Sequence, residues 1–322
     1  MSFWQDKKVL VTGATGLLGS ALIKELGKQR ADTVCLVRDW VPRSELFRKQ
    51  NLNGVSIVSG SITNQPLVER VLGEYEIETV FHLAAQTIVS VANKNPVSTF
   101  ESNIQGTWTV LEACQRSPTV NSVIVASSDK AYGCQPLPYT EDMPMKGTYP
   151  YDVSKACVDM LSQSYAKTYG LPVSITRCAN FYGEGDLNWN RIIPGTIRSV
   201  LRGQPPIIRS DGTTVRDYLY IEDAADGYLS LARHLTEHVW DFRGEAFNLA
   251  TSHPITTRDL VDTILYLMGS DLPVIIQNST THEIQEQWLS AEKANWMLNW
   301  RPAHSLEEGL TKTIKWYSDN LQ

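Results

Sequence analysis

Residues 8–19 read Lys-Val-Leu-Val-Thr-Gly-Ala-Thr-Gly-Leu-Leu-Gly. The first five are typical of a short buried strand, and a helical pattern follows from Leu18 to about Gln29. Glycines at 13 and 16 let the backbone turn tightly and approach a pyrophosphate, and a glycine at 19 lets the helix pack closely on the strand. Strand, turn and helix in this order predict a dinucleotide site, with a plain strand-to-helix turn as the alternative. The residues expected to contact NAD(P) here are Gly13, Thr15, Gly16, Leu17 and Leu18.

The second expected strand, Thr33–Val37, ends at Arg38. Enzymes built for NAD usually carry an acid at this point to bind the ribose 2′-hydroxyl, whereas an arginine can meet the 2′-phosphate of NADP. Arg38 therefore favours NADP. In the alternative interpretation Arg38 is solvated and Asp39 reaches the ribose. Ser61 and Ile62 follow the third strand, where the adenine edge is expected.

Small residues follow the fourth expected strand, at 79–83. In a doubly wound sheet, ligands bind beyond the carboxyl ends of the strands, so small side chains there let a cofactor pass. We expect Leu83, Ala84 and Ala85 to contact the cofactor, and Gln86 to contact the substrate.

Short apolar runs alternate with helical patterns along the rest of the chain. Strands are also expected at 55–58, 122–126, 172–177, 218–221 and 247–249, and helices at about 97–116, 191–201, 257–268 and 306–320 and from 151 and 222. We therefore expect an α/β fold, a Rossmann-like doubly wound parallel sheet with a smaller α/β substrate-binding lobe. Residues 1–180 would form the NAD(P)-binding Rossmann domain, and the chain would return to this domain near 217–250. Residues 181–322 would form the substrate-binding lobe, which is therefore interleaved with the first domain. Asn103 is either a polar surface residue or a group that supports the active site.

Tyr151-Asp-Val-Ser-Lys155 begins the helix after Pro150. Its spacing puts Tyr151 and Lys155 on one helix face about one turn apart. A neighbouring ammonium lowers the pKa of a phenol, so we expect Tyr151 to act as a base near neutral pH. The alternative is that Y-x-x-x-K occurs by chance on an amphipathic helix. Ser128, Asp129 and Lys130 follow the strand at 122–126, level with the glycine turn, so they are expected to share its site.

Four polar residues in the second half of the chain are candidates for substrate binding. Asn180 lies in a glycine-rich connection and Arg191 opens a helix, while Arg209 and Arg216 are loop cations that could clamp a diphosphate. Solvated surface arginines are the alternative. Arg216 is better placed than Arg209 because a strand and a helix follow it directly.

Composition excludes several other classes of function. The chain has 322 residues and a net charge of −6, which argues against a nucleic-acid partner. Five scattered cysteines suit a reducing compartment, and no apolar run approaches the roughly 18 residues that span a bilayer. We expect a cytoplasmic protein with no membrane partner. His234-Leu-Thr-Glu-His238 matches the H-x-x-E-H pattern of some zinc peptidases, but no third ligand is evident, so no metal is expected.

Six segments occur together in the chain: Gly13–Gly19, His82–Ala85, Ser127–Ser128, Tyr151-x-x-x-Lys155, Asn180–Gly183 and Leu298–Pro302. This ordered set, which spans essentially the whole chain, resembles the extended short-chain dehydrogenase/reductases that act on nucleotide sugars. Within them it is most similar to the 4,6-dehydratases, especially those acting on CDP-glucose. The similar segments are Phe3-Trp-Gln, Ser128-Asp-Lys130 and Gly185-Asp186 leading to Arg191-Ile-Ile-Pro194.

The resemblance implies a role for each candidate residue. Ser128 and Tyr151 would bind the sugar O4, with Tyr151 as base, and Lys155 would lower the pKa of Tyr151 and hold the nicotinamide ribose. Hydride would pass from C4 to the cofactor and return to C6 after water is lost across C5 and C6. Asp129 would protonate the departing oxygen, which requires burial to raise its pKa. The positions that match phosphate contacts in the family are Asn180, Arg191 and Arg216.

Lys130 departs from most 4,6-dehydratases, which carry a glutamate there as the C5 base, and resembles the CDP-glucose enzymes. A lysine can be this base only if its pKa is depressed. Alternatively, Lys130 is a cation that stabilises the enolate while another group takes the proton. The substrate-lobe loops are also shorter than a CDP-glucose dehydratase leads us to expect, which leaves the nucleotide base open.

Two other functions stay open. A sugar-nucleotide 4-epimerase shares Ser128, Tyr151 and Lys155 but needs no acid for C6, so Asp129 and Lys130 distinguish the two. The other is a non-catalytic dinucleotide-binding regulator, against which the intact Ser, Tyr and Lys set argues. The resemblance also implies a homodimer, with the helices near 97–116 and 151–169 packing across a two-fold axis. In the alternative, these helices face the protein's own second lobe.

Overall fold

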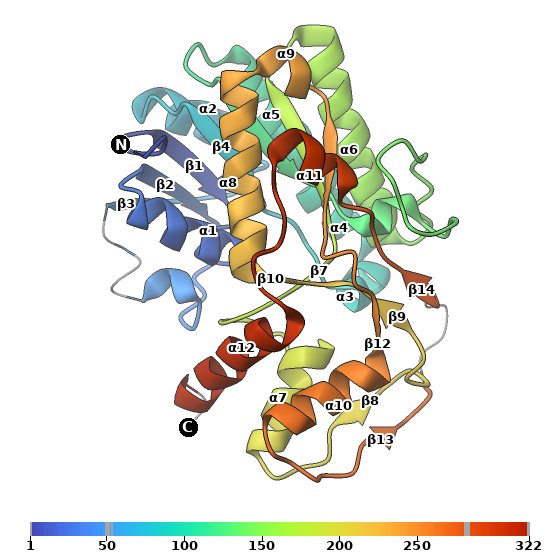
Figure 1. Ribbon diagram of the computed structural model, residues 1–322. Coiled ribbons are helices and arrows are strands. Elements are labelled where there is room, and N and C mark those ends of the chain that lie inside the picture. The colour runs from blue at the N-terminus through green and yellow to red at the C-terminus, as the bar shows by residue number, and fades with distance from the viewer. Residues whose placement is uncertain (1, 49–51, 53, 280–283, 321–322) are drawn as a thin grey trace.

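A computed structural model describes residues 2–48, 52, 54–279 and 284–320 of the chain. Its centre is a seven-stranded parallel sheet with the order β11-β6-β5-β4-β1-β2-β3 (Figure 1). The strands are β1 Lys8–Thr12, β2 Asp32–Val37, β3 Val55–Ser59, β4 Thr79–His82, β5 Ser122–Ala126, β6 Val173–Cys178 and β11 Ala246–Leu249. This is the doubly wound α/β fold predicted from the sequence, and the order reverses between β1 and β4.

Alternate side chains of the central strands enter two separate cores. Val9 and Val11 of β1 pack on one face of the sheet, and Leu10 between them packs on the other. Because both faces are covered, the strands read as continuous apolar runs rather than as alternating patterns.

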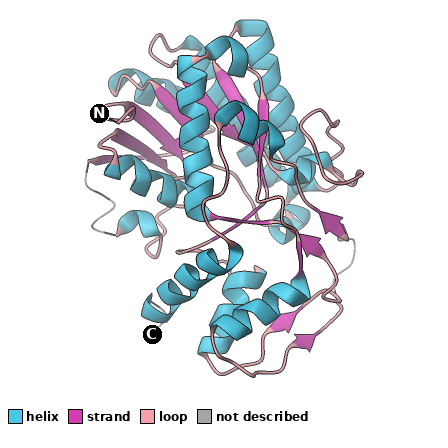
Figure 2. Ribbon diagram, viewed as in Figure 1, coloured by secondary structure: helices cyan, strands magenta, loops and turns pink. Residues whose placement is uncertain are grey.

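Helices cover both faces of this sheet (Figure 2). On one face, α1 (Leu17–Lys28) packs against α8 (Ile221–Glu237). On the other, α2 (Gln65–Glu74) packs against α5 (Gly106–Arg116), which in turn packs against α6 (Pro150–Tyr169). The helix expected at about 97–116 is divided. It consists of α4 (Pro96–Phe100), a π-helical turn η3 (Glu101–Gln105) and α5.

A second group of elements lies beyond the carboxyl ends of the large sheet (Figure 1). The helices there are α7 Ile192–Leu201, α10 Thr257–Leu267 and α12 Leu306–Asn320. Three small sheets join β7 Asn180–Tyr182 to β10 Tyr218–Tyr220, β9 Val215–Arg216 to β12 Ile255–Thr256 and β14 Glu286–Gln287, and β8 Ile207–Ile208 to β13 Ile275–Ile276. The shorter helices are η1 Glu45–Phe47, α3 Val89–Lys94, η4 Asp129–Tyr132, α9 Val239–Phe242 and α11 Glu292–Leu298.

Local sequence signals explain where two of these helices begin. Thr256 caps α10 by accepting a hydrogen bond from the backbone N–H of Asp259. Before α12, Ser305 Oγ accepts from Glu308 N at 3.2 Å and the Glu308 carboxylate accepts from Ser305 N at 2.8 Å, which together form a capping box.

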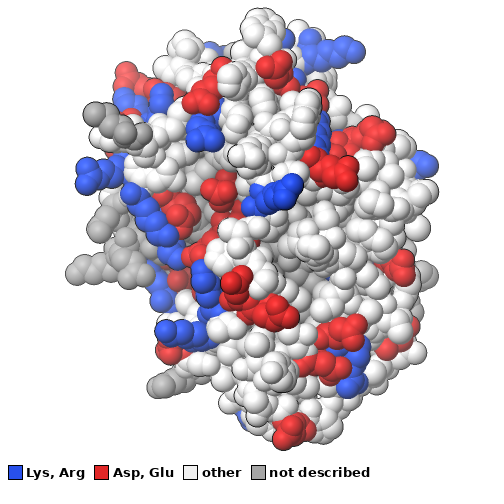
Figure 3. Space-filling model, viewed as in Figure 1, with Lys and Arg blue, Asp and Glu red and all other residues white. Residues whose placement is uncertain are grey.

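Helix hydrophobicity and surface charge each bear on the expectations from composition. Within the described part of the chain, no helix is both long and apolar enough to cross a bilayer. Basic and acidic side chains are interspersed on the face that Figure 3 shows.

Candidate active site

The glycine turn lies against the end of β4. Gly13 has a φ of +72°, and a Cβ there would come within 2.7 Å of the backbone nitrogen of Ala84. Thr12 fixes the opposite side of this contact, because its Oγ1 accepts hydrogen bonds of 3.2 Å from the backbone N–H groups of Leu83 and Ala84. The two strand ends therefore meet with no side chain between them.

Helix α1 begins directly after this turn. Its N-cap residue is Gly16, which has no side chain to accept from the first-turn N–H groups. These donors and the positive end of the helix dipole form an anion site. Gly19 is needed for the close approach, since a Cβ there would lie 2.3 Å from the carbonyl oxygen of Gly13.

Two cavities meet at the glycine turn, and Gly13, Thr15 and Ala85 line both. A cavity of about 220 Å³ extends towards the ends of β2 and β3. Its lining includes the predicted cofactor residues Arg38, Ser61, Ile62 and Ala84. A cavity of about 360 Å³ extends towards β5 and α6. Its lining includes Gly16, Leu17, Leu18, Leu83, Tyr151 and Lys155. Every residue predicted to bind the cofactor thus lines one continuous groove.

In the lining of the smaller cavity, Arg38 and Asp39 are paired with each other. The Nε of Arg38 donates to the Asp39 carboxylate at 2.7 Å, and both side chains are exposed. Asp39 partly neutralises Arg38 and adds a negative charge beside it, which disfavours a 2′-phosphate.

Ser128, Asp129, Lys130, Tyr151 and Lys155 line the larger cavity together. Strand β5 ends at Ala126 and the 3-10 turn η4 follows, with Ser128 as its N-cap. Ser128 Oγ donates to Asp129 Oδ1 at 2.9 Å and accepts from Lys130 N at 3.2 Å. This local bonding fixes the turn that carries the first three side chains.

The expected lowering of the pKa of Tyr151 by Lys155 is not found in this structure. Burial raises the pKa of Tyr151 to about 12, and a hydrogen bond with Ser128 opposes this only in part. Lys155 Nζ instead donates to the backbone carbonyl of Ala126 at 2.7 Å. Burial also lowers the pKa of Lys155 to about 8, so the ammonium is itself only weakly favoured.

The structure shows the raised pKa that the expected role of Asp129 as an acid requires, and the role itself stays a prediction. Burial raises the pKa of its carboxyl above the usual 3.8, against the opposing charge of Lys130 and the hydrogen bond from Ser128. The side chain is 5% exposed and still lines the cavity. Burial thus shifts the Asp129 carboxyl towards its neutral form within the lining of this cavity.

Two buried residues hold this region in place. His82 lies between Thr12 Oγ1 at 2.9 Å and Thr107 Oγ1 at 3.0 Å, and burial lowers its pKa to about 3, so it is neutral. Asn103 is buried rather than on the surface. It accepts from Gln86 N at 2.7 Å and donates to Ser154 Oγ on α6 at 2.9 Å.

The predicted substrate residues divide into two groups. Ser128, Asn180 and Arg191 line the cavity of about 360 Å³. Gln86 lines only the smaller cavity, because Asn103 holds its backbone and its Oε1 accepts from Ile88 N. Arg209 lies on the surface and donates to Asn190. The guanidinium of Arg216 is buried against the backbone carbonyls of the segment before β14, so it does not reach the lining.

Sequence reasoning missed Gln287. It lies on β14, and its Oε1 accepts a hydrogen bond from Lys130 Nζ. The contact joins residues 157 positions apart, so no local spacing indicates it.

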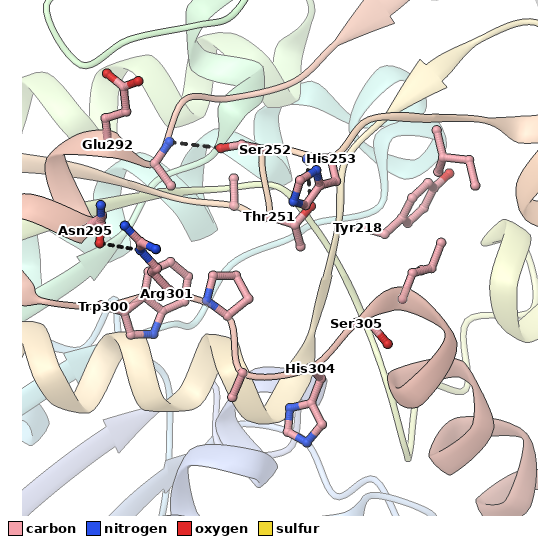
Figure 4. A pocket seen from close by; sticks show the side chains of 16 residues that line it. Tyr218, Thr251, Ser252, His253, Glu292, Asn295, Trp300, Arg301, His304 and Ser305 are labelled. Atoms are coloured by element: carbon pink, nitrogen blue, oxygen red, sulfur yellow. Dashed lines mark hydrogen bonds between the residues drawn. The ribbon is translucent and has the colours of Figure 1, made fainter.

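A further cavity of about 450 Å³ lies between residues 250–255 and 300–306 (Figure 4). Hydrogen bonds join some of the residues that line it. Arg301 Nε donates to Asn295 Oδ1 at 2.6 Å, and Ser252 Oγ accepts from Ala291 N at 3.3 Å. None of the predicted site residues lines it.

The H-x-x-E-H segment forms no metal site. His234 Nδ1 lies 2.8 Å from the carbonyl oxygen of Ser230, and the ring centroids of His234 and His238 are 6.4 Å apart. Among the described residues, no group of three or more His, Cys, Asp or Glu could hold a metal ion.

Residues 9–250 match the model of the NAD dependent epimerase/dehydratase family. The CDP-glucose 4,6-dehydratase of Salmonella typhimurium is 29% identical over 98% of this chain and 92% of that relative. A trifunctional UDP-glucose 4,6-dehydratase/UDP-4-keto-6-deoxy-D-glucose 3,5-epimerase/UDP-4-keto-L-rhamnose-reductase of Arabidopsis thaliana is 31% identical over 99% of this chain. The chain spans about half of that relative, 48% of its length.

The chain is similar to solved structures of both epimerases and dehydratases. The UDP-glucose 4-epimerase of Thermotoga maritima with UDP-glucose has a TM-score of 0.88 at 26% identity, covering 98% of this chain and 100% of that one. The dTDP-glucose 4,6-dehydratase of Streptomyces venezuelae with NAD bound has a TM-score of 0.85 at 28% identity, covering 97% of each chain. Identities this alike do not separate dehydratase from epimerase.

Proposed function

The chain belongs to the NAD dependent epimerase/dehydratase family, and we propose that within it the protein is a nucleotide-sugar 4,6-dehydratase. It would convert an NDP-hexose into the NDP-4-keto-6-deoxyhexose, with CDP-glucose as the first candidate because of the Ser128-Asp-Lys130 sequence and the similarity to a CDP-glucose 4,6-dehydratase. One observation carries the proposal. A buried acid with a raised pKa, Asp129, lies in the same cavity as Ser128 and Tyr151.

The groove suits a dinucleotide. A Cβ on Gly13 would fill the place where the turn meets Ala84, and the uncapped start of α1 offers N–H groups to a pyrophosphate. We propose that the residues of the two adjoining cavities named above hold NAD(P). When bound, the cofactor accepts a hydride from the sugar C4 and returns it at C6.

Tyr151 would remove the proton from the sugar O4, with the Ser128 hydroxyl bound to the same oxygen. Tyr151 acts as a base only if its pKa falls from the value of about 12 that burial gives it. Lys155 can lower it once its Nζ turns from Ala126 O towards the phenol. Lys155 then serves both the base and the nicotinamide ribose.

Asp129 and Lys130 would act in the loss of water. Oxidation at C4 makes the C5 proton acidic, and a protonated Asp129 donates its proton to the C6 oxygen as the C–O bond breaks. Lys130 lies beside Asp129 in the cavity lining, where it either takes the C5 proton or stabilises the enolate as a cation while water or another group takes that proton. The water that leaves consists of the C6 hydroxyl and the Asp129 proton, and the proton removed from C5 balances the one that Asp129 gives up.

A 4-epimerase is the second candidate, because the Thermotoga maritima enzyme has a similar fold at similar identity. Asp129→Asn separates the two. In a dehydratase it lowers dehydration by about 100-fold or more while C4 oxidation persists, because only the proton donor for O6 is lost. An epimerase inverts C4 without an acid at O6, so Asp129→Asn would leave its turnover within a few-fold of wild type.

The comparisons do not support the NADP preference inferred from Arg38. The family is NAD dependent, the Streptomyces venezuelae relative has NAD bound, and Asp39 is paired with Arg38 in the lining of the smaller cavity. We propose that NAD binds at least as tightly as NADP. Calorimetric titration of each dinucleotide tests this, and tighter binding of NADP by tenfold or more would restore the role of Arg38 as a 2′-phosphate ligand.

The substrate lobe is proposed to comprise residues 181–322 apart from the returns near 217–250. Asn180 and Arg191 are the candidates for the diphosphate, since both line the larger cavity. Arg209 and Arg216 stay predictions as phosphate ligands and would have to leave their present hydrogen bonds to act as such.

We also propose a homodimer formed through α3 to α6. These helices carry large apolar side chains that are exposed to solvent, a pattern that indicates an interaction surface. The exposed side chains are Val89, Val91, Val97, Trp108, Met160 and Tyr169.

A further inference from the structure

Lys130 is joined to the C-terminal part of the chain through Gln287. Its Nζ donates to Gln287 Oε1, and the two residues come from η4 and β14. Gln287 is 1% exposed and Lys130 is half-buried, so the contact is partly shielded from water. A hydrogen bond in such surroundings restricts the position of the lysine head group more than one in bulk water does.

The backbone around Gln287 is held on both sides. Strand β14 pairs with β9 in parallel, with Gln287 opposite Arg216. Two residues further on, Leu289 forms a bridge with Tyr139, and Tyr139 N donates to Trp288 O at 3.0 Å. The segment that carries Gln287 is therefore fixed against both the small sheet and the loop that follows η4.

The carboxamide of Gln287 is unusual for a buried position. Its Nε2 is buried and has no acceptor among the described residues, while its Oε1 faces Lys130. A leucine of similar size would fill this space without desolvating an unpaired amide. Packing alone therefore does not account for the residue, whereas an acceptor for Lys130 does.

We propose that Gln287 is a positioning residue that acts through Lys130 in the loss of water. Its carbonyl would fix Lys130 Nζ beside Asp129, above the C5–C6 edge of a bound sugar. This inference rests on the proposed dehydratase function. Binding of the nucleotide sugar and oxidation at C4 use other residues, so they would not depend on Gln287.

Gln287→Leu tests the proposal, with Gln285→Leu as the matched control. Gln285 lies just before β14, is exposed, and donates from Nε2 to Thr213 outside the cavity. We expect Gln287→Leu to lower kcat for dehydration by about 10- to 100-fold with KM within about twofold of wild type. C4 oxidation should persist, seen as reduced cofactor that accumulates at its absorbance maximum. Gln285→Leu should match wild type.

Gln287→Glu gives a conservative rescue. A carboxylate oxygen can accept the same hydrogen bond, so we expect kcat within about fivefold of wild type. The carboxylate also favours the ammonium, so the apparent pKa in the rate profile that belongs to Lys130 should rise. An unchanged pKa would contradict the contact between residue 287 and Lys130.

A double variant asks whether the effect passes through Lys130. With Lys130→Met in place, adding Gln287→Leu should slow dehydration by less than about twofold, because the group that Gln287 positions is already gone. Full additivity of the two losses would overturn the proposal. So would a Gln287→Leu protein that equals Gln285→Leu, or one in which cofactor binding and C4 oxidation fall together with dehydration.

Chemical labelling separates failure of this inference from failure of the proposed function. Acetylation of Lys130 by acetic anhydride, followed by peptide mass spectrometry, needs no turnover. We expect faster labelling of Lys130 in Gln287→Leu than in wild type or Gln285→Leu. If Lys130 is labelled faster in Gln287→Leu but the wild-type protein dehydrates no sugar, the contact is supported and the dehydratase assignment is overturned. Equal labelling in all three would overturn the contact.

Discussion

At the scale of one residue, the burial of Asp129 lowers the stability of the folded protein and also suits the proposed role of Asp129 as an acid. The carboxyl is buried among groups that do not fully compensate its charge, so its pKa is raised. That environment suits a general acid at neutral pH, and it disfavours the ionised form in the folded protein. Burial of the carboxyl is thus the common origin of the lower stability and of the proposed function.

Asp129→Asn should therefore stabilise the protein. The folded-state pKa of Asp129 lies above its usual value of 3.8, so the folded state binds more protons than the unfolded state between the two values. Stability is lost as pH rises through the folded pKa. Asparagine removes this loss, which predicts a gain of about 1 kcal/mol at pH 7.

Thermal unfolding of both proteins from pH 4 to pH 8 checks this. The difference in Tm should be largest near neutral pH and shrink as the pH approaches 4. A constant difference, or a Tm of Asp129→Asn below that of wild type at pH 7, would contradict the assigned environment of Asp129.

Residues with local spacing were predictable, and residues that act across the fold were not. Ser128, Tyr151 and Lys155 follow strand or helix signals, and all three line one cavity. The pKa of Tyr151 was predicted in the wrong direction, because sequence spacing does not show burial or the competing Ala126 carbonyl. Gln287 gave no signal, because its partner is distant in sequence.

At the scale of elements, the turn between β1 and α1 sets the cofactor groove. Gly13→Ala would place a Cβ within 2.7 Å of the Ala84 backbone nitrogen at a positive φ. We expect a loss of at least about tenfold in NAD affinity and of about 1–3 kcal/mol in stability. Fluorescence titration and urea unfolding measure the two effects.

Gly27→Ala, in the helix α1 that follows this turn, is the control. A Cβ at Gly27 meets no atom within 4 Å, so this change should leave NAD affinity unaltered and stabilise α1 by about 0.5–1 kcal/mol. Equal behaviour of the two variants would mean that the Gly13 turn does not form the cofactor site.

Helix α6, which carries Tyr151 and Lys155, is tied to β6 by a buried ion pair. Arg177 donates to Asp159 through Nε at 2.8 Å and Nη2 at 3.0 Å. Arg177→Met leaves the Asp159 carboxylate buried without its charge partner, so we expect a loss of about 3–5 kcal/mol in urea unfolding. Arg258→Met, which breaks an exposed pair with Asp262, should change stability by less than about 0.5 kcal/mol.

Element prediction followed the strength of the local pattern. The strands of the large sheet were found to within one or two residues because they are short apolar runs between turn signals. The two-residue strands β8, β9, β12, β13 and β14 were missed because they carry no periodic pattern. The π-helical turn at Glu101–Gln105 was also missed, since it follows from the buried bonds of Asn103 rather than from propensity.

At the scale of the whole molecule, the proposed dimer predicts the effect of a single charge. Met160 on α6 is 62% exposed, and burying a glutamate there between two subunits would be costly. We expect Met160→Glu to convert a dimer to a monomer by light scattering. Tyr266→Glu on α10, at a still more exposed large side chain outside α3–α6, should leave the dimer intact. A wild-type monomer would exclude the proposed interface.

The central claim is that this chain removes water from a nucleotide sugar, and mass spectrometry tests it most directly. The purified protein would be incubated with NAD and, separately, with CDP-, GDP-, UDP- and dTDP-linked glucose or mannose, without added reductant. We predict that one of them, CDP-glucose first, loses the mass of one water. An unchanged mass with a new sugar stereoisomer on chromatography would instead establish an epimerase and contradict the roles assigned to Asp129 and Lys130.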